Sequence, residues 1–472
     1  MKRPALALLV AAAVAGCGGG ETASPDEPAE LRALLADSRE EASSALARVV
    51  ERRDRRYVGP LIELLRAGEL GIGGGVTLQE VIDALQALSG QRLAGDWNAW
   101  VEWYAGTRLR PPPGFTVWKG RIMSQIDLRF GRFFAEGEPS RIRVEEVVWG
   151  GVQLDGIPAL DEPRTLPAAD AGYLDPEDPV FGVELNGDAR AYPLRILDWH
   201  EMANDVVGGV PVSLAYCTLC GAGVLYETRT SERTFDFGSS GFLMRSNKLM
   251  YDRQTYTLWN QLTGEPVLGP LADEDIELEV RPLVVTSWRR WRRQHPDTRV
   301  LSMRTGFDRP YERGAAYGRY FASPEKMFPA RSPRRGLAPK ERVFALRLGS
   351  GAAKAYPIAR ILPRGVVNDR VGGQPVAVVT AGGRLITRGR EARTGLATVY
   401  DSGAEVRAFE RGKRRFRPAG QGALRDERDR VWRVTERALL GPGGERLERL
   451  GGHLAYAFGW LSYFPNSEIY RG

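Results

Sequence analysis

The chain has 472 residues, of which 43% are hydrophobic and 26% are charged. This length and composition exclude a disordered or fibrous protein and allow two to four domains with substantial cores. The net charge of +7 is spread along the chain, so we read it as surface charge and predict no nucleic-acid partner.

The first 17 residues have the pattern of an export signal. Lys2 and Arg3 precede an apolar run from Ala5 to Ala15 that is too short to span a bilayer, and small residues lead into Cys17. The pattern resembles a bacterial lipoprotein signal peptide (residues 1–17), which implies that Cys17 is lipidated and becomes the mature N-terminus. An ordinary signal peptide or a chance apolar start is the alternative.

Residues 18–30 predict a flexible tether because they are rich in Gly, Ser, Pro and Glu. Together with the lipid, this predicts an extracytoplasmic protein anchored to the bacterial cell envelope, with the membrane as its partner. Disulfides persist in such a compartment. A cysteine pair there must be protected by a metal, be oxidised, or cycle between thiol and disulfide.

Residues 31–110 predict a small helical domain of HEAT-like character. Leucine and valine recur at helical spacing, and Thr77 and Glu80 stand at the positions of a capping box. Residues 96–104 carry tryptophans three positions apart, which we interpret as helix packing. Two or three helices do not establish a repeat array, so a docking domain is the simpler interpretation. The Pro-Pro-Pro-Gly run at residues 111–114 marks its end.

Residues 115–322 predict a β-rich domain. Its strongest signal is an alternating stretch, residues 183–192, which turns at Asn186-Gly187 and indicates a hairpin. Further elements follow in chain order: strands at 210–216 and 224–228, a short helix at 283–293, and a Pro/Arg/Ser-rich linker at 323–340.

After this linker the chain repeats itself, and residues 341–472 predict a second copy of the same domain. Tyr192-Pro193 recurs as Tyr356-Pro357 and Asn204-Asp205 recurs as Asn368-Asp369, both 164 positions later. Chance explains a constant offset without gaps poorly. The predicted fold class is therefore α+β, with a helical domain followed by two tandem β-rich copies.

Three chemically distinctive residues of the first copy are missing from the second. The positions facing each other at this offset are His200 and Arg364, Cys217 and Ala381, and Cys220 and Arg384. The Tyr-Pro, Asn-Asp and Gly-Gly elements around them are retained and therefore indicate architecture. The joint loss of the three indicates a single functional site that is present once.

His200, Cys217 and Cys220 predict a mononuclear transition-metal site. Thiolate and imidazole suit copper or zinc, and a CxxC pair followed by glycine between two strands is typical of a metal-binding knuckle. Three protein ligands leave one position for water, a substrate or a weak ligand. Met244 and Met250 are the candidate fourth ligands.

Two nearby carboxylates and the two remaining histidines are further candidates for the site. Glu201 and Asp205 are candidates for orienting His200 as hydrogen-bond acceptors, although solvated side chains are the simpler interpretation. His295 and His453 are interpreted as surface or packing residues.

Two other interpretations of the cysteines remain open. Cys217 and Cys220 can form a disulfide that stabilises a pocket between the two copies of a non-enzymatic binding protein. They can also act as a thiol–disulfide oxidoreductase with a reactive Cys217. The pattern indicates no nucleotide cofactor and identifies no protein or small-molecule partner, and it leaves open whether the protein is an enzyme.

Several motifs of this region resemble a known bacterial family. They are His200, Asn204-Asp205, Gly208-Gly209, Tyr216-Cys217-x-x-Cys220-Gly221 and Leu249-Met250-Tyr251-Asp252. The family is the one described as domain of unknown function 3179, and the resemblance runs from about residue 120 to the C-terminus. It implies no activity. Our leading hypothesis is therefore a membrane-anchored metalloprotein in a redox, metal-handling or hydrolytic role.

Overall fold

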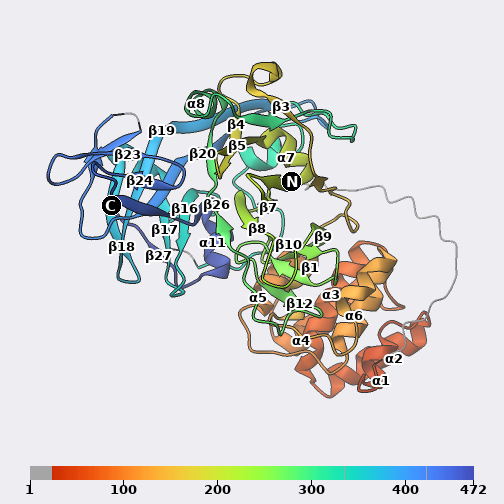
Figure 1. Ribbon diagram of the computed structural model, residues 1–472. Coiled ribbons are helices and arrows are strands. Elements are labelled where there is room, and N and C mark those ends of the chain that lie inside the picture. Colours follow the sequence, from red (N-terminus) through yellow and green to blue (C-terminus); the bar gives the residue numbers. More distant parts are fainter. Residues whose placement is uncertain (1–23, 334, 421) are drawn as a thin grey trace.

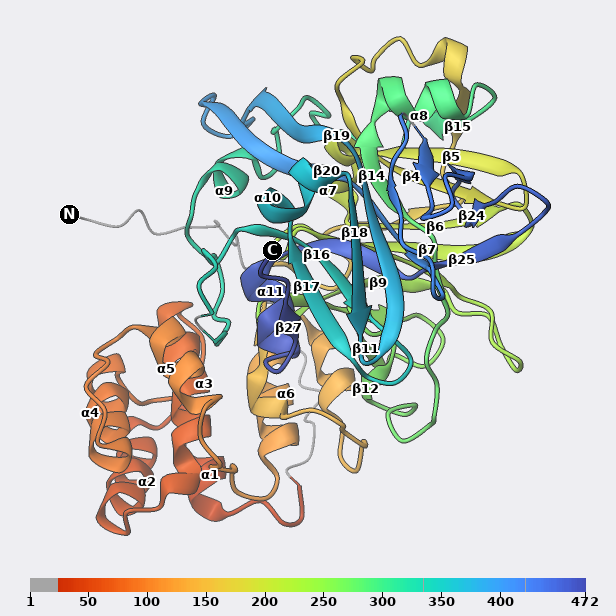
Figure 2. The same ribbon diagram turned by 90° about the vertical axis from the view of Figure 1, so that its left-hand side faces the viewer.

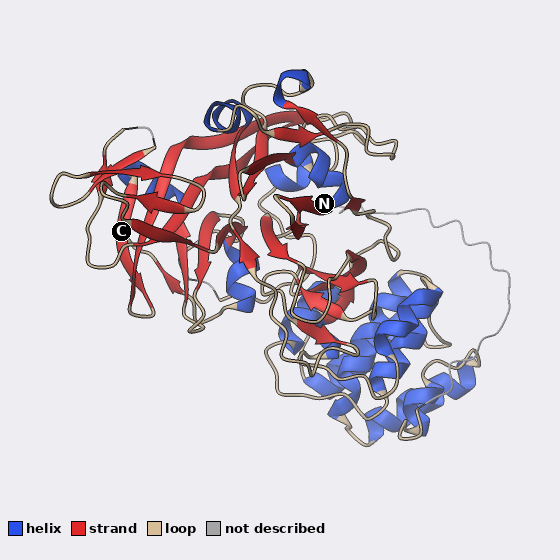
Figure 3. Cartoon of the chain, in the orientation of Figure 1, coloured by secondary structure: helices blue, strands red, loops and turns tan. Residues whose placement is uncertain are grey.

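The structure is a computed structural model that describes residues 24–333, 335–420 and 422–472. Its N-terminal helices gather at one end, and its strands form the larger remainder (Figure 1, Figure 3). The predicted α+β class is confirmed. The predicted signal peptide, Cys17 included, and residues 18–23 of the tether lie outside the described residues. Within the described ranges, no helix has the length and apolar character that a bilayer crossing requires.

The N-terminal part is helical because each segment carries its apolar residues on one face. The predicted capping box is present: the Thr77 hydroxyl accepts from the Glu80 backbone, and the Glu80 carboxylate accepts from the Thr77 backbone. Trp100 is fully buried in the shared core. The elements are α1 (Ala29–Ala33), α2 (Arg39–Glu51), η1 (Arg55–Tyr57), α3 (Val58–Glu69), α4 (Leu78–Ser89) and α5 (Trp97–Tyr104).

The helical part continues past the proline run at residues 111–114. The helices α6 (Phe115–Ser124) and η2 (Leu128–Phe134) follow directly, because Gly114 adopts φ 74° and starts α6. The prediction that residue 115 opens the β-rich part therefore differs from the structure. The first strand is β1 (Val147–Trp149).

The first β-rich copy contains the following elements: η3 (Val144–Glu146), β2 (Leu160–Asp161), β3 (Thr165–Pro167), η4 (Ala168–Asp170), β4 (Pro179–Leu185), β5 (Asp188–Pro193), α7 (Leu194–His200), β6 (Met202–Val207), β7 (Val210–Cys217), β8 (Ala222–Glu227), β9 (Phe237–Met244), β10 (Asn247–Asp252), β11 (Leu258–Asn260), β12 (Pro266–Leu268), β13 (Val280–Arg281), β14 (Val284–Ser287), α8 (Trp288–Gln294), β15 (Arg299–Leu301) and α9 (Gly318–Ala322). The strands form sheets in the orders β14-β4-β5-β15-β3, β13-β8-β7-β6-β2 and β1-β9-β10-β11-β12.

The predicted hairpin joins β4 and β5. Leu185 pairs with Asp188, and Asn186 and Gly187 both have positive φ, at 50° and 85°. This is the backbone that an Asn-Gly turn favours. The helix predicted at 283–293 is shorter than expected, because residues 284–287 pair with β4 as strand β14 before α8 begins.

The second β-rich copy contains the following elements: β16 (Arg342–Arg347), β17 (Ala353–Pro357), α10 (Ile358–Ile361), η5 (Leu362–Arg364), β18 (Val366–Val371), β19 (Gln374–Arg390), β20 (Ala397–Glu410), β21 (Arg417–Pro418), β22 (Ala423–Arg425), β23 (Val431–Val434), β24 (Ala438–Leu440), β25 (Arg446–Leu450), β26 (Gly452–Tyr456), α11 (Ala457–Tyr463) and β27 (Glu468–Ile469). Its sheets have the orders β26-β16-β17-β27 and β18-β19-β20-β25-β24-β23-β22-β21.

One sheet has the same plan in both copies. In β14-β4-β5-β15 and in β26-β16-β17-β27, the first three strands are antiparallel and the last strand joins parallel to the third. A helix follows the third strand, and another helix precedes the last one. This shared plan supports the duplication, which stays our interpretation of the chain.

The two copies differ most at the turn that carries the cysteines. In the first copy, β7 and β8 are joined by the four residues 218–221. In the second copy, β19 and β20 continue past the matching position as a long hairpin arm (residues 382–403), with register shifts at Ala381 to Arg384 and at Leu385 to Ile386. The arm lies beside α9 of the first copy, as Figure 2 shows, and the Arg390 N–H donates to the Arg313 carbonyl.

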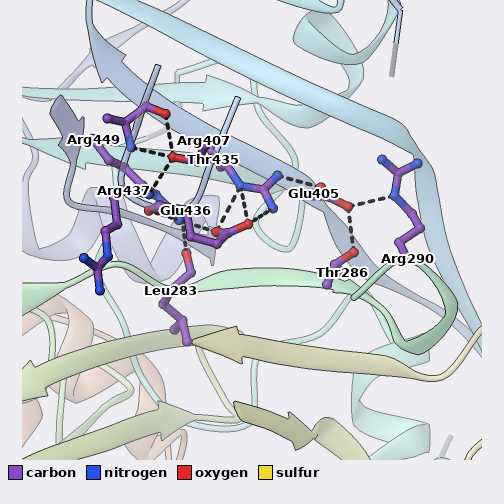
Figure 4. A network of polar contacts seen from close by, with 10 residues as sticks. Leu283, Thr286, Arg290, Glu405, Arg407, Thr435, Glu436, Arg437 and Arg449 are labelled. Carbon is purple, nitrogen blue, oxygen red and sulfur yellow. Dashed lines mark hydrogen bonds and ion pairs between the residues drawn. The ribbon is translucent and has the colours of Figure 1, made fainter. Parts of the chain in front are cut away.

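A buried chain of charges joins the two copies (Figure 4). Glu405 accepts from Thr286 at 2.6 Å and from Arg290 at 2.8 Å, both of the first copy. Arg407 lies between Glu405 and Glu436. Burial alone would raise the pKa of Glu436, but the charges of Arg407 and Arg449 lower it to about 2. The paired charges therefore stay ionised in a site closed to water.

Candidate functional site

The cysteine pair occupies the tight turn between β7 and β8. Cys217 ends β7 opposite Ala222, and Gly221 closes the turn at φ 58°. The Cys220 N–H donates to Cys217 Sγ at 3.4 Å. The predicted turn-then-strand geometry is therefore present. An N–H directed at a sulfur is also typical of metal-binding knuckles.

Both sulfurs face one backbone carbonyl. Ser246 O lies 3.1 Å from Cys220 Sγ and 3.9 Å from Cys217 Sγ. Arg245 and Ser246 form the turn between β9 and β10 at φ 51° and 63°, and this turn aims the carbonyl at the sulfurs. Both cysteines are free and buried. Burial, followed by the neighbouring Cys217 thiol, raises the pKa of Cys220 well above its usual value, so this thiol is protonated.

The second copy covers the cysteine turn. Tyr456 N–H donates to the Cys220 carbonyl at 2.7 Å, and Arg342 Nη1 donates to the Gly221 carbonyl at 2.9 Å. Gly459 of α11 lies so close that an added Cβ would be 3.0 Å from both Cys220 Cβ and Sγ. The copy that lacks the cysteines therefore forms the wall over them.

His200 is held by other partners. Its Nδ1 lies 2.8 Å from the Pro158 carbonyl and its Nε2 lies 2.6 Å from the Tyr311 hydroxyl. Both ring nitrogens are therefore engaged. Across the described ranges, no three or more His, Cys, Asp or Glu side chains gather as a metal ion requires, so His200 is not grouped there with the cysteines.

Glu201 and Asp205 do not orient His200. The Asp205 carboxylate accepts from the Tyr192 hydroxyl at 2.7 Å. Glu201 is buried rather than solvated, and it turns toward the cysteines. Neither carboxylate serves as an acceptor for His200, because both ring nitrogens of His200 already contact Pro158 and Tyr311.

Glu201 is the residue that the sequence reasoning undervalued. Its carboxylate accepts from the Thr218 hydroxyl inside the CxxC turn at 2.6 Å and lies 3.4 Å from Lys248 Nζ. Both partners of this ion pair are buried. Glu201 also adopts φ 54°, which disfavours any residue with a Cβ. The second copy has Gly365 at this position, with φ 69°.

The two candidate methionine ligands belong to different parts of the core. Met244 packs in the apolar cluster that contains both cysteines, and its carbonyl accepts from the Tyr463 hydroxyl at 2.7 Å. Met250 belongs to a separate cluster, together with Met202. Of the two candidates, only Met244 shares a core cluster with the sulfurs.

Comparison with known families places the site within a family match. The family model described as protein of unknown function (DUF3179) matches residues 154–467. The chain belongs to this family. No curated protein matches the chain. No solved structure matches it either.

The DUF3179 match spans both copies. It includes the cysteine turn, Glu201, and the strand β26 and helix α11 that cover the cysteines. The resemblance seen in the sequence is confirmed at the level of the family. The matched unit therefore contains the site together with its cover.

A small cavity lies beside Tyr216, next to the cysteine turn of this DUF3179 protein. Asp198 of α7 lines it, with one carboxylate oxygen that has no hydrogen-bond partner among the described residues. Burial, followed by the charge of Glu201, raises the pKa of Asp198 to about 8. Arg342 lines the same cavity from the second copy. The cavity thus combines a neutral acid with a buried cation.

The two remaining histidines take part in packing, as predicted. His295 stacks on Trp291 with ring centroids 4.0 Å apart, and His453 meets the edge of Trp460. Burial lowers the pKa of His453 to about 4, so its imidazole is neutral.

Proposed function

We propose that Cys217 and Cys220 form a reversible dithiol–disulfide centre in an exported, lipid-anchored protein. The observation that carries the proposal is that both sulfurs face the Ser246 carbonyl while the Cys220 N–H donates to Cys217 Sγ. Two thiols held in one turn are already close to the arrangement in which an S–S bond forms.

The electrostatics of the closed site favour the neutral dithiol and disulfide forms over a thiolate, so the attacking thiolate must form when the turn is exposed. A carbonyl oxygen beside Cys220 Sγ stabilises S–H and repels a thiolate, in line with the raised pKa of Cys220. The nearby charges of Glu201 and Lys248 balance each other. Dithiol and disulfide are both neutral, so either form fits this buried position without a further counter-ion.

The oxidation balances with a disulfide compound as the electron acceptor. The S–S bond of that compound breaks as the bond between Cys217 Sγ and Cys220 Sγ forms. The two cysteines lose two electrons and two protons, and two thiols leave. The exchange passes through a mixed disulfide. Because both cysteines are buried beneath α11, the turn must separate from the second copy before a bulky disulfide compound can reach them.

A copper or zinc centre is the second candidate, supported by two sulfur donors and the N–H directed at Cys217. With both nitrogens of His200 engaged, a third ligand would come from elsewhere, and Met244 shares the core cluster of the sulfurs. A soft ion held by two thiolates suits copper(I) better than zinc, which favours four protein ligands in closed sites.

The test separates the two candidates on one sample. The purified protein is treated with oxidised glutathione or with dithiothreitol, then denatured and alkylated. The mass of the peptide that contains Cys217 and Cys220 is then measured by mass spectrometry. We expect loss of two hydrogens on oxidation, full recovery on reduction, and neither change in Cys217→Ser. Metal is measured in parallel. About one equivalent of copper or zinc, lost in Cys217→Ser and accompanied by resistance to oxidation, would overturn the dithiol proposal in favour of the metal centre.

A further inference from the structure

A second cavity opens between the copies and meets the first one at Phe321 and Arg342, which line both. Its volume is about 190 Å³. Its walls combine apolar side chains, Phe321, Ile358 and Tyr456 among them, with charged ones. The charged side chains that line it are Lys340, Glu341, Arg342, Arg384 and Asp401.

We call this second cavity the outer cavity. Two of its basic side chains, Arg342 and Lys340, have no carboxylate partner among the described residues. Arg342 is 7% exposed and donates to the carbonyls of Gly221 and Asp401, and no described residue forms an ion pair with it. Lys340 donates to the Tyr320 carbonyl and likewise has no ion-pair partner within the described ranges. Burial, followed by the charge of Arg342, lowers the pKa of Lys340 to about 7, so a bound carboxylate would favour its charged form. Arg384, by contrast, is paired with Asp401 at 3.2 Å. Both cations also lie over aromatic rings, Lys340 over Tyr320 and Arg342 over Tyr456, but neither has an anionic partner among the described residues, so a ligand carboxylate can supply one.

We propose that the outer cavity binds a small organic monocarboxylate, with its carboxylate on Lys340 and Arg342 and its apolar body against Phe321 and Tyr456. A single negative charge suits two cations that share the cavity with Glu341, whereas a doubly charged phosphate would exceed that balance. The volume limits the ligand to a few carbon atoms or one aromatic ring.

The first cavity, which Asp198 lines and which we call the inner cavity, supports a ligand carboxylate that points toward Arg342. Asp198 is 4% exposed, lines that cavity, and leaves one oxygen without a partner among the described residues. A protonated Asp198 can donate to a ligand carboxylate or to a water beside it. Arg342 therefore lines both the open cavity and the cavity of this unpartnered acid.

The test is calorimetric titration of the full-length reduced protein with sodium acetate and with sodium benzoate at constant ionic strength. We expect saturable binding of at least one of them at one site per chain, weakened at least tenfold in Lys340→Gln. Arg388→Gln is the control because Arg388 is an exposed cation that does not line the cavity, on the hairpin arm that also carries Arg384. Its affinity should stay within twofold of the wild type.

A second variant protects the test against misfolding. Should Lys340→Gln fail to fold, Arg384→Gln frees Asp401 inside the cavity and should weaken binding at least threefold, because an unpaired carboxylate then faces the ligand. Absence of saturable binding by either carboxylate, equal loss in Arg388→Gln, or binding of inorganic phosphate alone would overturn the proposal.

Discussion

The two β-rich copies solve the same backbone problem in different ways. After its short helical segment, each copy has a residue with positive φ. This residue is Gly365 in the second copy and Glu201 in the first. Glycine meets this need without strain, whereas a residue with a Cβ is held there only by its surroundings. In the first copy, Thr218 and Lys248 hold Glu201 in this conformation by binding its carboxylate. Strain at this one position therefore marks the copy that carries the chemistry.

The same contrast appears in the next turn. The first copy keeps four residues between β7 and β8 and places two thiols there, while the second extends the matching strands into an arm. The second copy also presents α11, whose Gly459 lies against Cys220. One copy thus supplies the two cysteines, and the other supplies their cover.

The largest expected effect comes from breaking the charge network between the copies. Glu436→Gln leaves Arg407 and Arg449 buried without their shared carboxylate, so the free energy of unfolding should fall by about 3–5 kcal/mol. Urea unfolding measures it. Glu445→Gln is the control, since that carboxylate bridges partly exposed arginines, and it should cost less than about 1 kcal/mol. Equal costs would show that the buried network contributes no more to stability than a surface ion pair.

Replacing the strained residue by the residue of the other copy should cost somewhat less. Glu201→Gly relieves backbone strain of about 1 kcal/mol but leaves Lys248 buried without a partner, a net loss of about 2–4 kcal/mol. The double variant Glu201→Gly with Lys248→Met should recover most of this loss in the same unfolding experiment. If the single variant is as stable as the wild type, the ion pair does not hold the turn.

A methyl group at the contact between α11 and the cysteines tests the cover itself. Gly459→Ala places a Cβ 3.0 Å from Cys220 Sγ, so we expect a loss of about 1–3 kcal/mol through overpacking. Thermal unfolding in reducing buffer measures it. Gly383→Ala, where an added methyl meets nothing within 4 Å, should change little, and a similar loss in both variants would contradict the close contact.

The smallest change, when it is counted per pH unit, is a pH dependence of stability. The pKa of Asp198 is about 8 in the folded chain against an ordinary value of 3.8, so the folded state binds a proton that the unfolded state releases. The corresponding stability is fully present below pH 3.8 and is lost as pH rises to about 8. The free energy of unfolding of Asp198→Asn should therefore rise relative to that of the wild type by up to about 1 kcal/mol per pH unit across this window. A gap that does not change with pH would place Asp198 in contact with water.

The sequence was informative where local rules decide the outcome. The Asn186-Gly187 turn, the capping box at Thr77 and the strands on either side of the cysteines follow from short-range preferences, and all are present. The repeat also separated the cysteines from residues kept for architecture. These features need only neighbours along the chain.

The composition of the site could not be read in the same way. His200 and the cysteines were grouped because they are scarce, yet spacing along the chain does not fix what a ring nitrogen meets, and Pro158 and Tyr311 come from distant segments. The importance of Glu201 could have been predicted from the repeat, because a glycine in one copy that aligns with a glutamate in the other indicates a strained backbone position. Lys248 and the cover by α11 depend on tertiary contacts that no local pattern encodes.

The most direct test of the account is the rate at which Cys220 is alkylated in the native, reduced protein. We predict slow modification in the wild type, at least tenfold faster modification in Glu405→Gln, which weakens the contact with Thr286 and Arg290 of the first copy, and no change in Glu445→Gln. Fast alkylation of the wild type, or equal rates in all three proteins, would contradict the claim that the second copy closes the cysteine site of the first.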